Sequence, residues 1–317
     1  MVEQPAVLIT DAVHPLLLEG LQQAGYYCVY QPDIAASVVL NTIKDYVGIV
    51  INSKILVDKK FLDRAPKLEF VARLGSGLEI IDLDYARQKG VLVHRSPDGN
   101  CDAVAEHAIG MLLALANNLC RGNQEVRQKI WQREANRGWE LMGKTVGIIG
   151  FGYTGSAFAK RLSGFGVEIL AYDKYKSGYA KNLKNVLETD LEQIVQKADI
   201  ISLHLPLTTE TRYWADDAFF DKLEKPIVLV NSSRGAVLNT ASLLNALDKG
   251  IVIGACLDVF ENEKPKTYSE EQEKLFADLF ARENIILTPH VAGWTRESKE
   301  RLSKLLLDRI LGKEKMR

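Results

Sequence analysis

Short apolar runs alternate with longer amphipathic segments along this chain, and that order constrains the fold more than any other feature. In the first hundred residues the runs of strand length are Ala6 to Thr10, Tyr26 to Tyr30, Val47 to Ile51, Phe70 to Arg73 and Val91 to His94. Strands separated by helices pair in parallel, and a parallel sheet is covered by helices on both faces. The pattern therefore predicts an α/β protein with a doubly wound parallel sheet.

A second series of strand-length runs begins at residue 145. It comprises Thr145 to Ile149, Glu168 to Tyr172, Ile200 to Leu203, Ile227 to Asn231, Ile253 to Leu257 and Ile285 to Leu287. Six parallel strands are the usual number in a dinucleotide-binding sheet. A chain of 317 residues is also too long for one efficient hydrophobic core, so we expect two lobes, each with a doubly wound parallel sheet.

Two helical patterns connect these series. One opens at Asn100 and carries apolar residues on a helical period up to Ala116, so we expect it to bridge the lobes. The other, Arg296 to Leu311, has apolar residues spaced for one helical face. This second helix could return to the first lobe.

The composition excludes several classes of partner. Lys and Arg total 40 and Asp and Glu total 41, so the chain lacks the positive charge that draws proteins onto nucleic acids. Hydrophobic residues make up 47% and charged residues 26%, which favours a globular chain. No stretch approaches the roughly 20 apolar residues of a membrane span, and no secretory signal opens the chain. We expect no membrane partner and a cytoplasmic protein.

The four cysteines indicate neither a disulfide framework nor a metal site. Cys28, Cys101, Cys120 and Cys256 are far apart, form no CxxC pair and have no histidines at ligand spacing. We therefore expect reduced, mostly buried thiols and no bound metal.

Three glycines with GxGxxG spacing follow the run at Thr145 and precede a helical pattern. Gly150 permits a tight turn, Gly152 has no Cβ to obstruct a pyrophosphate, and Gly155 lets the helix pack closely on the strand. The diphosphate would then lie against free amides at the helix N-terminus. Alone, the glycines would be typical of an ordinary glycine-rich turn, but this context predicts a dinucleotide site.

Asp173 directly follows the next run and lies 18 residues after Gly155. A carboxylate there can accept hydrogen bonds from the ribose hydroxyls and repels a 2′-phosphate, which favours NAD over NADP. The neighbouring Lys174 and Lys176 could weaken this discrimination. The alternative, a solvated aspartate in a turn, is common in general but less expected at this offset.

Ionisable residues follow three strands of the second series, where ligands of parallel sheets collect. Arg234 offers a planar fork for a substrate carboxylate and can polarise a C2 carbonyl. An unperturbed imidazole has a pKa near neutral pH, so a histidine such as His290 can donate a proton to the forming hydroxyl and accept it in the reverse direction. Glu263, if it reaches the other ring nitrogen, would favour the imidazolium form and fix the tautomer. The set predicts hydride transfer at C2 of a 2-keto acid.

Each of these residues also has an ordinary explanation. An arginine after two serines is usually a surface residue, a glutamate in a polar segment is usually solvated, and such a histidine is often structural. Their shared position after strands favours the catalytic interpretation. His14, His94 and His107 lack that position and are expected to be structural, whereas His204 is expected to line the adenine pocket.

Seven segments, in this order along nearly the whole chain, resemble motifs of the D-isomer-specific 2-hydroxyacid dehydrogenases, and within them the phosphoglycerate dehydrogenase-like branch. The segments are Arg73–Gly77, Asp102–His107, Gly147–Gly152, Ser202–Pro206, Asn231–Gly235, Leu257–Phe260 and Thr288–Gly293. The resemblance implies that Arg234, Glu263 and His290 form the catalytic set.

The resemblance also implies a Rossmann NAD-binding domain, residues 99–293, inserted into a flavodoxin-like substrate domain made of residues 1–98 and 294–317. Asp258 is implied near the nicotinamide carboxamide, and Ser76 and Gly77 would present amides to the substrate carboxylate. Further cofactor contacts are expected from Tyr153, Thr154, Leu205, Pro206, Ser232 and Gly293. Active members are usually dimers with the helix after Asn100 at the interface, so a homodimer is expected.

Two departures from the family pattern concern the substrate. Relatives that use phosphoglycerate tend to have an arginine after the third strand, where this chain has Asn52 and, two residues later, Lys54. Phosphate recognition would rest on Lys54. The acid that is usually Asp after Gly77 is here Glu79.

The function favoured by these residues is that of an NAD-dependent oxidoreductase, which transfers a hydride between nicotinamide and C2 of a small D-2-hydroxy or 2-keto acid. Phosphoglycerate, hydroxypyruvate or glyoxylate, and D-lactate all remain open as substrates. The alternative is an NAD-sensing scaffold, because the family also resembles corepressors that keep the fold. A formate dehydrogenase is disfavoured, since relatives with that activity replace the acid at Glu263 by Gln.

Overall fold

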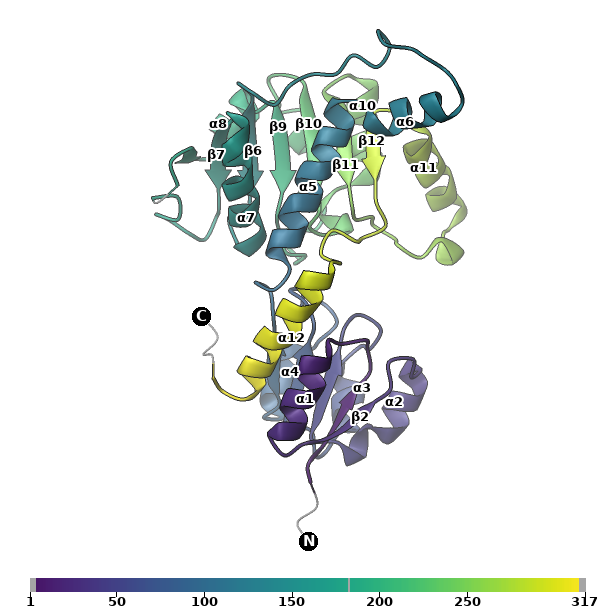
Figure 1. The fold of residues 1–317 in the computed structure, drawn as a ribbon, viewed down its shortest axis with the longest axis vertical. Helices are drawn as coiled ribbons and strands as arrows, with labels where there is room; N and C mark the ends of the chain where they lie inside the picture. The colour runs from purple at the N-terminus through teal and green to yellow at the C-terminus, as the bar shows by residue number, and fades with distance from the viewer. Residues whose placement is uncertain (1–3, 182, 314–317) are drawn as a thin grey trace. The chain divides into compact units, whose positions relative to one another are not determined.

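A computed structural model describes residues 4–181 and 183–313, and these form two compact units (Figure 1). The first unit comprises the described residues up to Asn100 together with those from Trp294 onward, and the second comprises Cys101–Gly293. The sequence-based boundaries fall after residues 98 and 293. Both units are built on parallel sheets covered by helices, as the predicted fold class requires.

The first unit contains a five-stranded parallel sheet in the order β2-β1-β3-β4-β5. Its strands are β1 (Ala6–Ile9), β2 (Tyr27–Tyr30), β3 (Gly48–Ile51), β4 (Phe70–Arg73) and β5 (Leu92–Arg95). Its helices are α1 (Pro15–Gln23), α2 (Ala36–Thr42), α3 (Lys59–Asp63), α4 (Leu83–Gln88) and α12 (Arg296–Ile310). The strand order reverses between β1 and β3, the kind of point beside which ligands bind in open α/β sheets.

Helix α12 returns to the first unit, as its apolar spacing predicts. A capping box of Thr295 and Ser298 starts the helix. Its Leu306 is fully buried in the same cluster as Leu17 of α1. Gly20 allows the two helices to approach closely, because a Cβ at that position would lie 2.2 Å from Leu307. The last helix of the chain thereby completes the core of the unit that contains the first strand.

The second unit contains, in the part of the chain that is described, a seven-stranded parallel sheet in the order β12-β11-β10-β9-β6-β7-β8. Its strands are β6 (Thr145–Ile149), β7 (Glu168–Tyr172), β8 (Val186–Glu188), β9 (Ile200–Leu203), β10 (Ile227–Asn231), β11 (Val252–Leu257) and β12 (Ile285–Leu287). The prediction of six strands was wrong, because β8 was missed. This strand has three residues and pairs only with β7, so it carries no apolar run that a sequence pattern could reveal.

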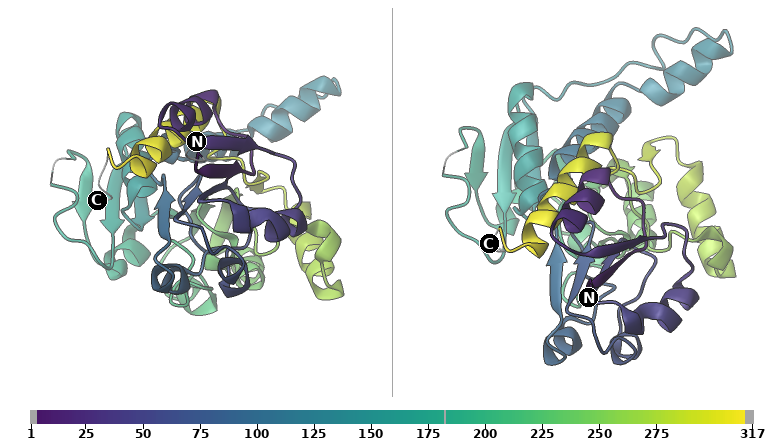
Figure 2. Two further views of the ribbon diagram at one scale, coloured as in Figure 1. Left: turned by 90° about the horizontal axis from the view of Figure 1, so that it is seen from below. Right: turned by 60° about the horizontal axis from the view of Figure 1, so that its bottom comes forward.

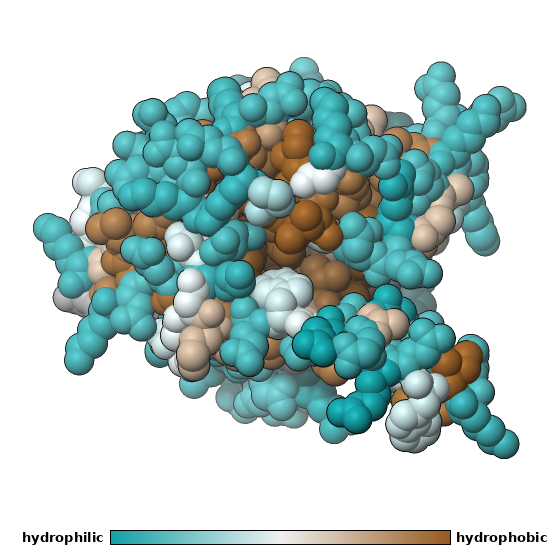
Figure 3. All heavy atoms as spheres, turned by 90° about the horizontal axis from the view of Figure 1, so that it is seen from above, coloured by the Kyte–Doolittle hydropathy of each residue, from teal (hydrophilic) through white to brown (hydrophobic). Residues whose placement is uncertain are grey.

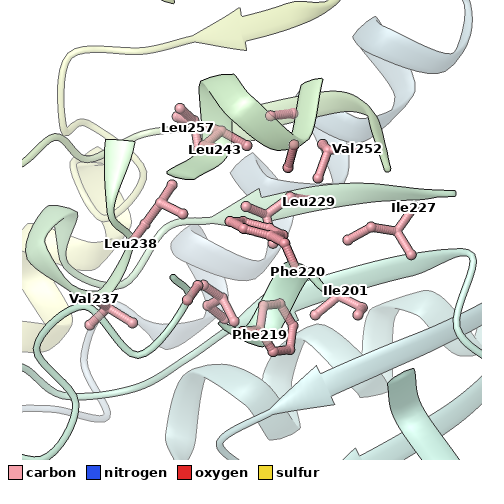
Figure 4. Packing of buried hydrophobic residues seen from close by; sticks show 14 of the residues in the cluster. Ile201, Phe219, Phe220, Ile227, Leu229, Val237, Leu238, Leu243, Val252 and Leu257 are labelled. Carbon is pink, nitrogen blue, oxygen red and sulfur yellow. The ribbon is translucent and has the colours of Figure 1, made fainter. Parts of the chain in front are cut away.

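Helices cover both faces of the seven-stranded sheet. They are α5 (Cys101–Ala116), α6 (Leu119–Arg127), α7 (Tyr153–Leu162), α8 (Leu191–Lys197), α9 (Asp217–Phe220), α10 (Thr240–Asp248) and α11 (Glu270–Ala281). One core layer contains Phe219, Phe220, Leu229 and Leu243 (Figure 4). A second layer, centred on Leu112 and Phe158, lies under α5 and α7. The two layers hold the strands rigidly, so that the loops after them have fixed positions.

Two other expectations concern the surface. Of the four cysteines only Cys256 is buried, so the expectation of mostly buried thiols was wrong: Cys120 lies exposed on α6. Among the described residues no single helix has the length and apolar character of a membrane span. Only α5 and α6 taken together, across a bend of 61°, meet those criteria, and eight residues of α5 are buried in the second unit.

Candidate active site

The loops at the carboxyl ends of β6, β7, β9, β10, β11 and β12 carry the candidate site residues of the second unit. The strand order reverses between β6 and β9, which pair directly with each other. In an open α/β sheet this switch point is where ligands bind.

The loop after β6 has the geometry of a dinucleotide cradle. Gly150 has a φ of +93°, and a Cβ there would lie 2.4 Å from the His204 carbonyl oxygen. A Cβ on Gly155 would lie 2.1 Å from the Gly150 carbonyl oxygen, whereas one on Gly152 would meet no described atom within 4 Å. The open space beside Gly152 is where a pyrophosphate can approach the backbone. The close contacts at Gly150 and Gly155 and the open space at Gly152 all fit a bound dinucleotide.

Helix α7 starts at this loop and leaves amides for an anion. Gly152 is the N-cap residue, and among the described residues no side chain caps the helix there. Tyr153 and Thr154 form its first turn. Free N–H groups and the positive end of the helix dipole favour a phosphate at this position.

Asp173, directly after β7, is tied to the glycine loop. Its Oδ2 accepts a hydrogen bond from the Phe151 N–H at 2.9 Å, and its Oδ1 accepts one from the Tyr175 N–H at 3.0 Å. The lysines on either side of Tyr175 have other partners: Lys174 pairs with Glu210, and Lys176 donates to the Phe151 carbonyl at 3.0 Å. The remaining lone pairs of Asp173 can receive ribose hydroxyls, as an NAD site requires.

Four further predicted cofactor residues lie in loops of the second unit. The Oγ of Ser232, after β10, is buried and has no hydrogen-bond partner among the described residues, which fits a group that serves a ligand. Leu205 lies beside the glycine loop, 3.2 Å from an ideal Cβ on Gly150, and Pro206 follows it. Gly293 is the last residue of the second unit.

His290 and Glu263 come together although 27 residues separate them. The Nδ1 of His290 lies 2.8 Å from Glu263 Oε2 and 3.0 Å from Oε1, so the other ring nitrogen, Nε2, is left for a substrate. Burial by itself raises the pKa of Glu263. The hydrogen bond and charge of His290, the Phe260 N–H and the charge of Arg234 outweigh burial, and the pKa of Glu263 is lowered. The predicted pairing of these two residues is present in the structure.

Arg234 approaches this pair because two loops touch. A Cβ on Gly235 would lie 1.8 Å from the Phe260 carbonyl oxygen, so the loop after β10 packs directly against the loop that carries Glu263. Arg234 Nη1 donates to the Ser233 carbonyl at 2.7 Å. Its charge also contributes to the lowered pKa of Glu263.

Asp258 is buried, with 1% of its surface exposed, and accepts three hydrogen bonds. They come from the Thr288 hydroxyl at 2.6 Å and from the N–H groups of Val291 and Ala292, each at 2.9 Å. Asp258 thus binds the backbone around His290. His107 of α5 lies 3.0 Å from the same hydroxyl. Thr288 and His107 lie in segments that resemble family motifs, but neither was predicted as a site residue, and His107 was interpreted as structural because it does not follow a strand.

The carbonyl of His204 lies beside Gly150 of the glycine loop, and the residue is partly buried. Its Nε2 lies 2.9 Å from the Ser202 hydroxyl, and its ring packs at 5.2 Å from that of Phe158. Burial lowers the pKa of His204 to about 4, so it is neutral at physiological pH. Its position supports the loop after β6.

The predicted substrate residues lie in the first unit, after β3 and β4. Asn52 donates its N–H to Asp11 at 3.0 Å and accepts at its carbonyl from Arg73 Nε at 3.1 Å. The Ser76 carbonyl, beside Gly77, accepts from Arg95 Nη1 at 3.0 Å. Lys54 donates to the Pro32 carbonyl at 2.5 Å. Arg73 and Arg95, which hold this loop region, were not predicted as site residues.

No group of three or more His, Cys, Asp or Glu side chains gathers at metal-binding distance anywhere in residues 4–181 and 183–313.

Comparison with known proteins identifies the family. Residues 109–292, more than half of the chain, match the model of the D-isomer specific 2-hydroxyacid dehydrogenase, NAD binding domain. The chain belongs to the D-isomer specific 2-hydroxyacid dehydrogenase family. This dehydrogenase is therefore an oxidoreductase whose cofactor is NAD, and it acts on small 2-hydroxy or 2-keto acids.

Individual relatives cover nearly the whole dehydrogenase. A glyoxylate reductase of Pyrococcus furiosus is 32% identical over 97% of this chain and 92% of its own length. A D-3-phosphoglycerate dehydrogenase of Mycobacterium tuberculosis is 35% identical over 94% of this chain, which spans 54% of that relative. A similar crystal structure is that of a D-lactate dehydrogenase from Aquifex aeolicus, complexed with NAD and lactic acid. Its TM-score is 0.84 and its identity is 28%, and the match covers 97% of this chain and 94% of that chain.

Proposed function

We propose that this dehydrogenase uses His290 as its proton donor and acceptor, Glu263 as the partner of that histidine, and Arg234 as the cation for the substrate carboxylate. The observation that carries the proposal is the contact between His290 Nδ1 and Glu263, at 2.8 Å, beside Arg234. The nicotinamide cofactor, when bound, would supply a hydride to C2 as NADH or accept one from C2 as NAD⁺. In reduction, Nε2 of His290 donates a proton to the carbonyl oxygen of C2 as that oxygen takes the electron pair of the broken π bond. In oxidation the same nitrogen accepts the hydroxyl proton.

The substrate we propose is a small 2-keto acid without a phosphate, of the glyoxylate or hydroxypyruvate type. Asn52 stands where an arginine would serve a phosphate, and Lys54 donates to the Pro32 carbonyl. The relative named as a glyoxylate reductase matches over 92% of its length, which supports the same class. The amides of Ser76 and Gly77 would bind the carboxylate, and Asp258 would lie near the nicotinamide carboxamide.

Steady-state oxidation of NADH tests this function. Glyoxylate, hydroxypyruvate, phosphohydroxypyruvate, pyruvate and 2-oxoglutarate are compared at equal concentration. We expect the highest kcat/KM with glyoxylate or hydroxypyruvate. A preference for phosphohydroxypyruvate would contradict the substrate class, and tight NADH binding without turnover of any acid would favour the scaffold alternative.

We also propose a homodimer. Helix α6 stands away from the rest of its unit in both views of Figure 2 and has no buried residue. Leu119, Val126, Ile130 and Trp131, on α6 and directly after it, are all exposed apolar side chains. Apolar side chains also gather within a hydrophilic rim on the face drawn in Figure 3. Exposed apolar surface of this kind supports association.

Light scattering tests the homodimer and should give twice the monomer mass. Trp131→Glu should lower the measured mass, and a monomeric wild type would contradict the proposal.

Finally, we propose a cytoplasmic location. All four cysteines are free thiols, which supports a reducing compartment. Cell fractionation against a cytoplasmic marker tests this, and recovery with secreted proteins would contradict it.

A further inference from the structure

We propose that His107 and Thr288 are positioning residues for His290 and act on it through the buried carboxylate of Asp258. The inference rests on the proposed role of His290 as proton donor. His107 and Thr288 themselves take no part in the proposed proton transfer.

The distances determine where the protons of this network lie. Both carboxylate oxygens of Asp258 accept backbone N–H groups, Oδ1 from Val291 and Oδ2 from Ala292. The Thr288 hydroxyl, 2.6 Å from Oδ1, must therefore donate its single hydrogen to Asp258. The same oxygen can then only accept from His107, whose Nε2 lies 3.0 Å away. His107 thus carries a proton on Nε2 and donates this hydrogen bond to the Thr288 hydroxyl. The hydroxyl in turn donates its hydrogen to Asp258.

The backbone of His290 needs such support. Its φ of +54° lies in the left-handed region, which is sterically disfavoured for residues with a Cβ. A conformation of this kind persists only where the surroundings determine it. The two residues that follow His290 are bound at their N–H groups by one carboxylate, and Thr288, two residues before it, is bound by the same carboxylate. Asp258 therefore holds both sides of the strained residue.

The network is built from three separate elements packed together. His107 comes from α5, Asp258 directly follows β11, and Thr288 directly follows β12. Met111, one turn after His107, also contacts the Thr288 hydroxyl, at 3.4 Å. Because Asp258 is only 1% exposed, water cannot replace a lost donor readily, and the network is strong for that reason. Loss of the hydroxyl would let the segment around His290 relax and move the imidazole from Glu263.

The experiment compares Thr288→Val, which removes the hydroxyl at constant volume, with Thr288→Ser, which keeps it. His107→Leu removes the first donor of the chain. Thr189→Val is the matched control, because the Thr189 hydroxyl is buried in the same unit without a hydrogen-bond partner among the described residues. Each full-length variant is assayed with NADH for kcat and KM with the most active keto acid of the panel and for the solvent deuterium isotope effect on kcat. The Kd of NADH and the Tm are measured on the same variants.

We expect Thr288→Val to lower kcat about tenfold and to raise the isotope effect, since proton transfer becomes slower. KM and the Kd of NADH should change less than about twofold. Thr288→Ser should restore kcat, His107→Leu should follow Thr288→Val, and Thr189→Val should match the wild type.

Three results would overturn the inference: wild-type kcat in Thr288→Val, failure of Thr288→Ser to restore kcat, or a loss of kcat matched by equal losses of NADH affinity and Tm. The His290→Ala variant distinguishes failure of the positioning network from failure of the proposed function. If His290→Ala keeps full activity, the role of His290 is wrong; if it is inactive while Thr288→Val is fully active, only the positioning network is wrong.

Discussion

The carboxyl edges of the two sheets differ although both sheets are parallel and both contain a strand-order reversal. At the edge of the seven-stranded sheet, ionisable side chains interact with one another: His290 contacts Glu263, and the charge of Arg234 contributes to the lowered pKa of Glu263. At the edge of the five-stranded sheet, two arginines bind backbone carbonyls, and Arg309 pairs with Asp98, which follows β5. Arg73 donates to Asn52 and Arg95 donates to Ser76.

This difference shows that topology provides an edge where ligands can bind, whereas the loops decide its chemistry. Side chains that pair with each other can exchange protons, so the second unit holds the reactive groups. Side chains that bind carbonyls fix the shape of a loop and leave its amides for a ligand. The five-stranded edge is therefore suited to recognition, and the four predictions below test that division.

The largest expected effect is that of His290→Ala. Loss of the general acid should lower kcat between about a hundredfold and ten thousandfold while the Kd of NADH stays nearly unchanged. Stopped-flow and steady-state NADH absorbance measure kcat, and fluorescence titration measures the Kd. His14→Asn in the first unit, which keeps a side-chain cap on α1, should retain full kcat. Equal losses in both variants would remove the contrast between the edges.

Acid should destabilise the second unit through His204; in the first unit, burial also lowers the pKa of His94, on β5. The pKa of His204 is lowered from 6.5 to about 4 in the folded state, so the unfolded chain binds the proton first. The contribution to stability is complete above pH 6.5 and is lost as the pH falls toward 4. The free energy of unfolding should drop by about 2 kcal/mol between pH 7.5 and pH 5.

Urea unfolding at both pH values measures this drop, and hydrogen exchange locates it. The free energy of unfolding of His204→Phe should depend less on pH than that of the wild type. At pH 5, the backbone amides of β6 and β9 should exchange faster in the wild type than in the variant. The same slope in both proteins would show that other groups cause the acid sensitivity.

Asp173→Ser should change cofactor choice at the seven-stranded edge. Removing the carboxylate removes the repulsion of a 2′-phosphate, so the ratio of kcat/KM for NADPH to that for NADH should rise about tenfold. Steady-state assays with both cofactors measure the ratio. Asp190→Ser, which changes an N-cap residue of α8, is the control. An unchanged ratio in Asp173→Ser would remove this residue from the ribose site.

The smallest effect is expected at the five-stranded edge. Arg95→Met should raise the KM for the keto acid about threefold with little change in kcat, because the guanidinium holds the Ser76 carbonyl and no reacting atom. Arg87→Met, at an exposed arginine on α4, is the control. A large fall in kcat for Arg95→Met would place chemistry at this edge as well.

Much of the fold could be predicted because buried parallel strands consist of continuous apolar runs. The predicted ranges of β4, β6, β7, β9, β10 and β12 agree with the structure residue for residue. Strand β8 was missed because an edge strand of three residues needs only one partner and no apolar run. The glycine loop could also be predicted, since Gly150 and Gly155 meet backbone atoms that exclude any side chain.

The amino-acid sequence alone determined the element order, the dinucleotide loop and the three reactive residue types. These features depend on local pattern and on position after a strand. The roles of His107, Thr288 and Arg95 depended on packing. His107 and Thr288 are 181 residues apart and meet only because α5 packs against the strands that precede Asp258 and Thr288. A hydrogen bond between distant residues has no local signature, since its partners are chosen by the packing of whole elements.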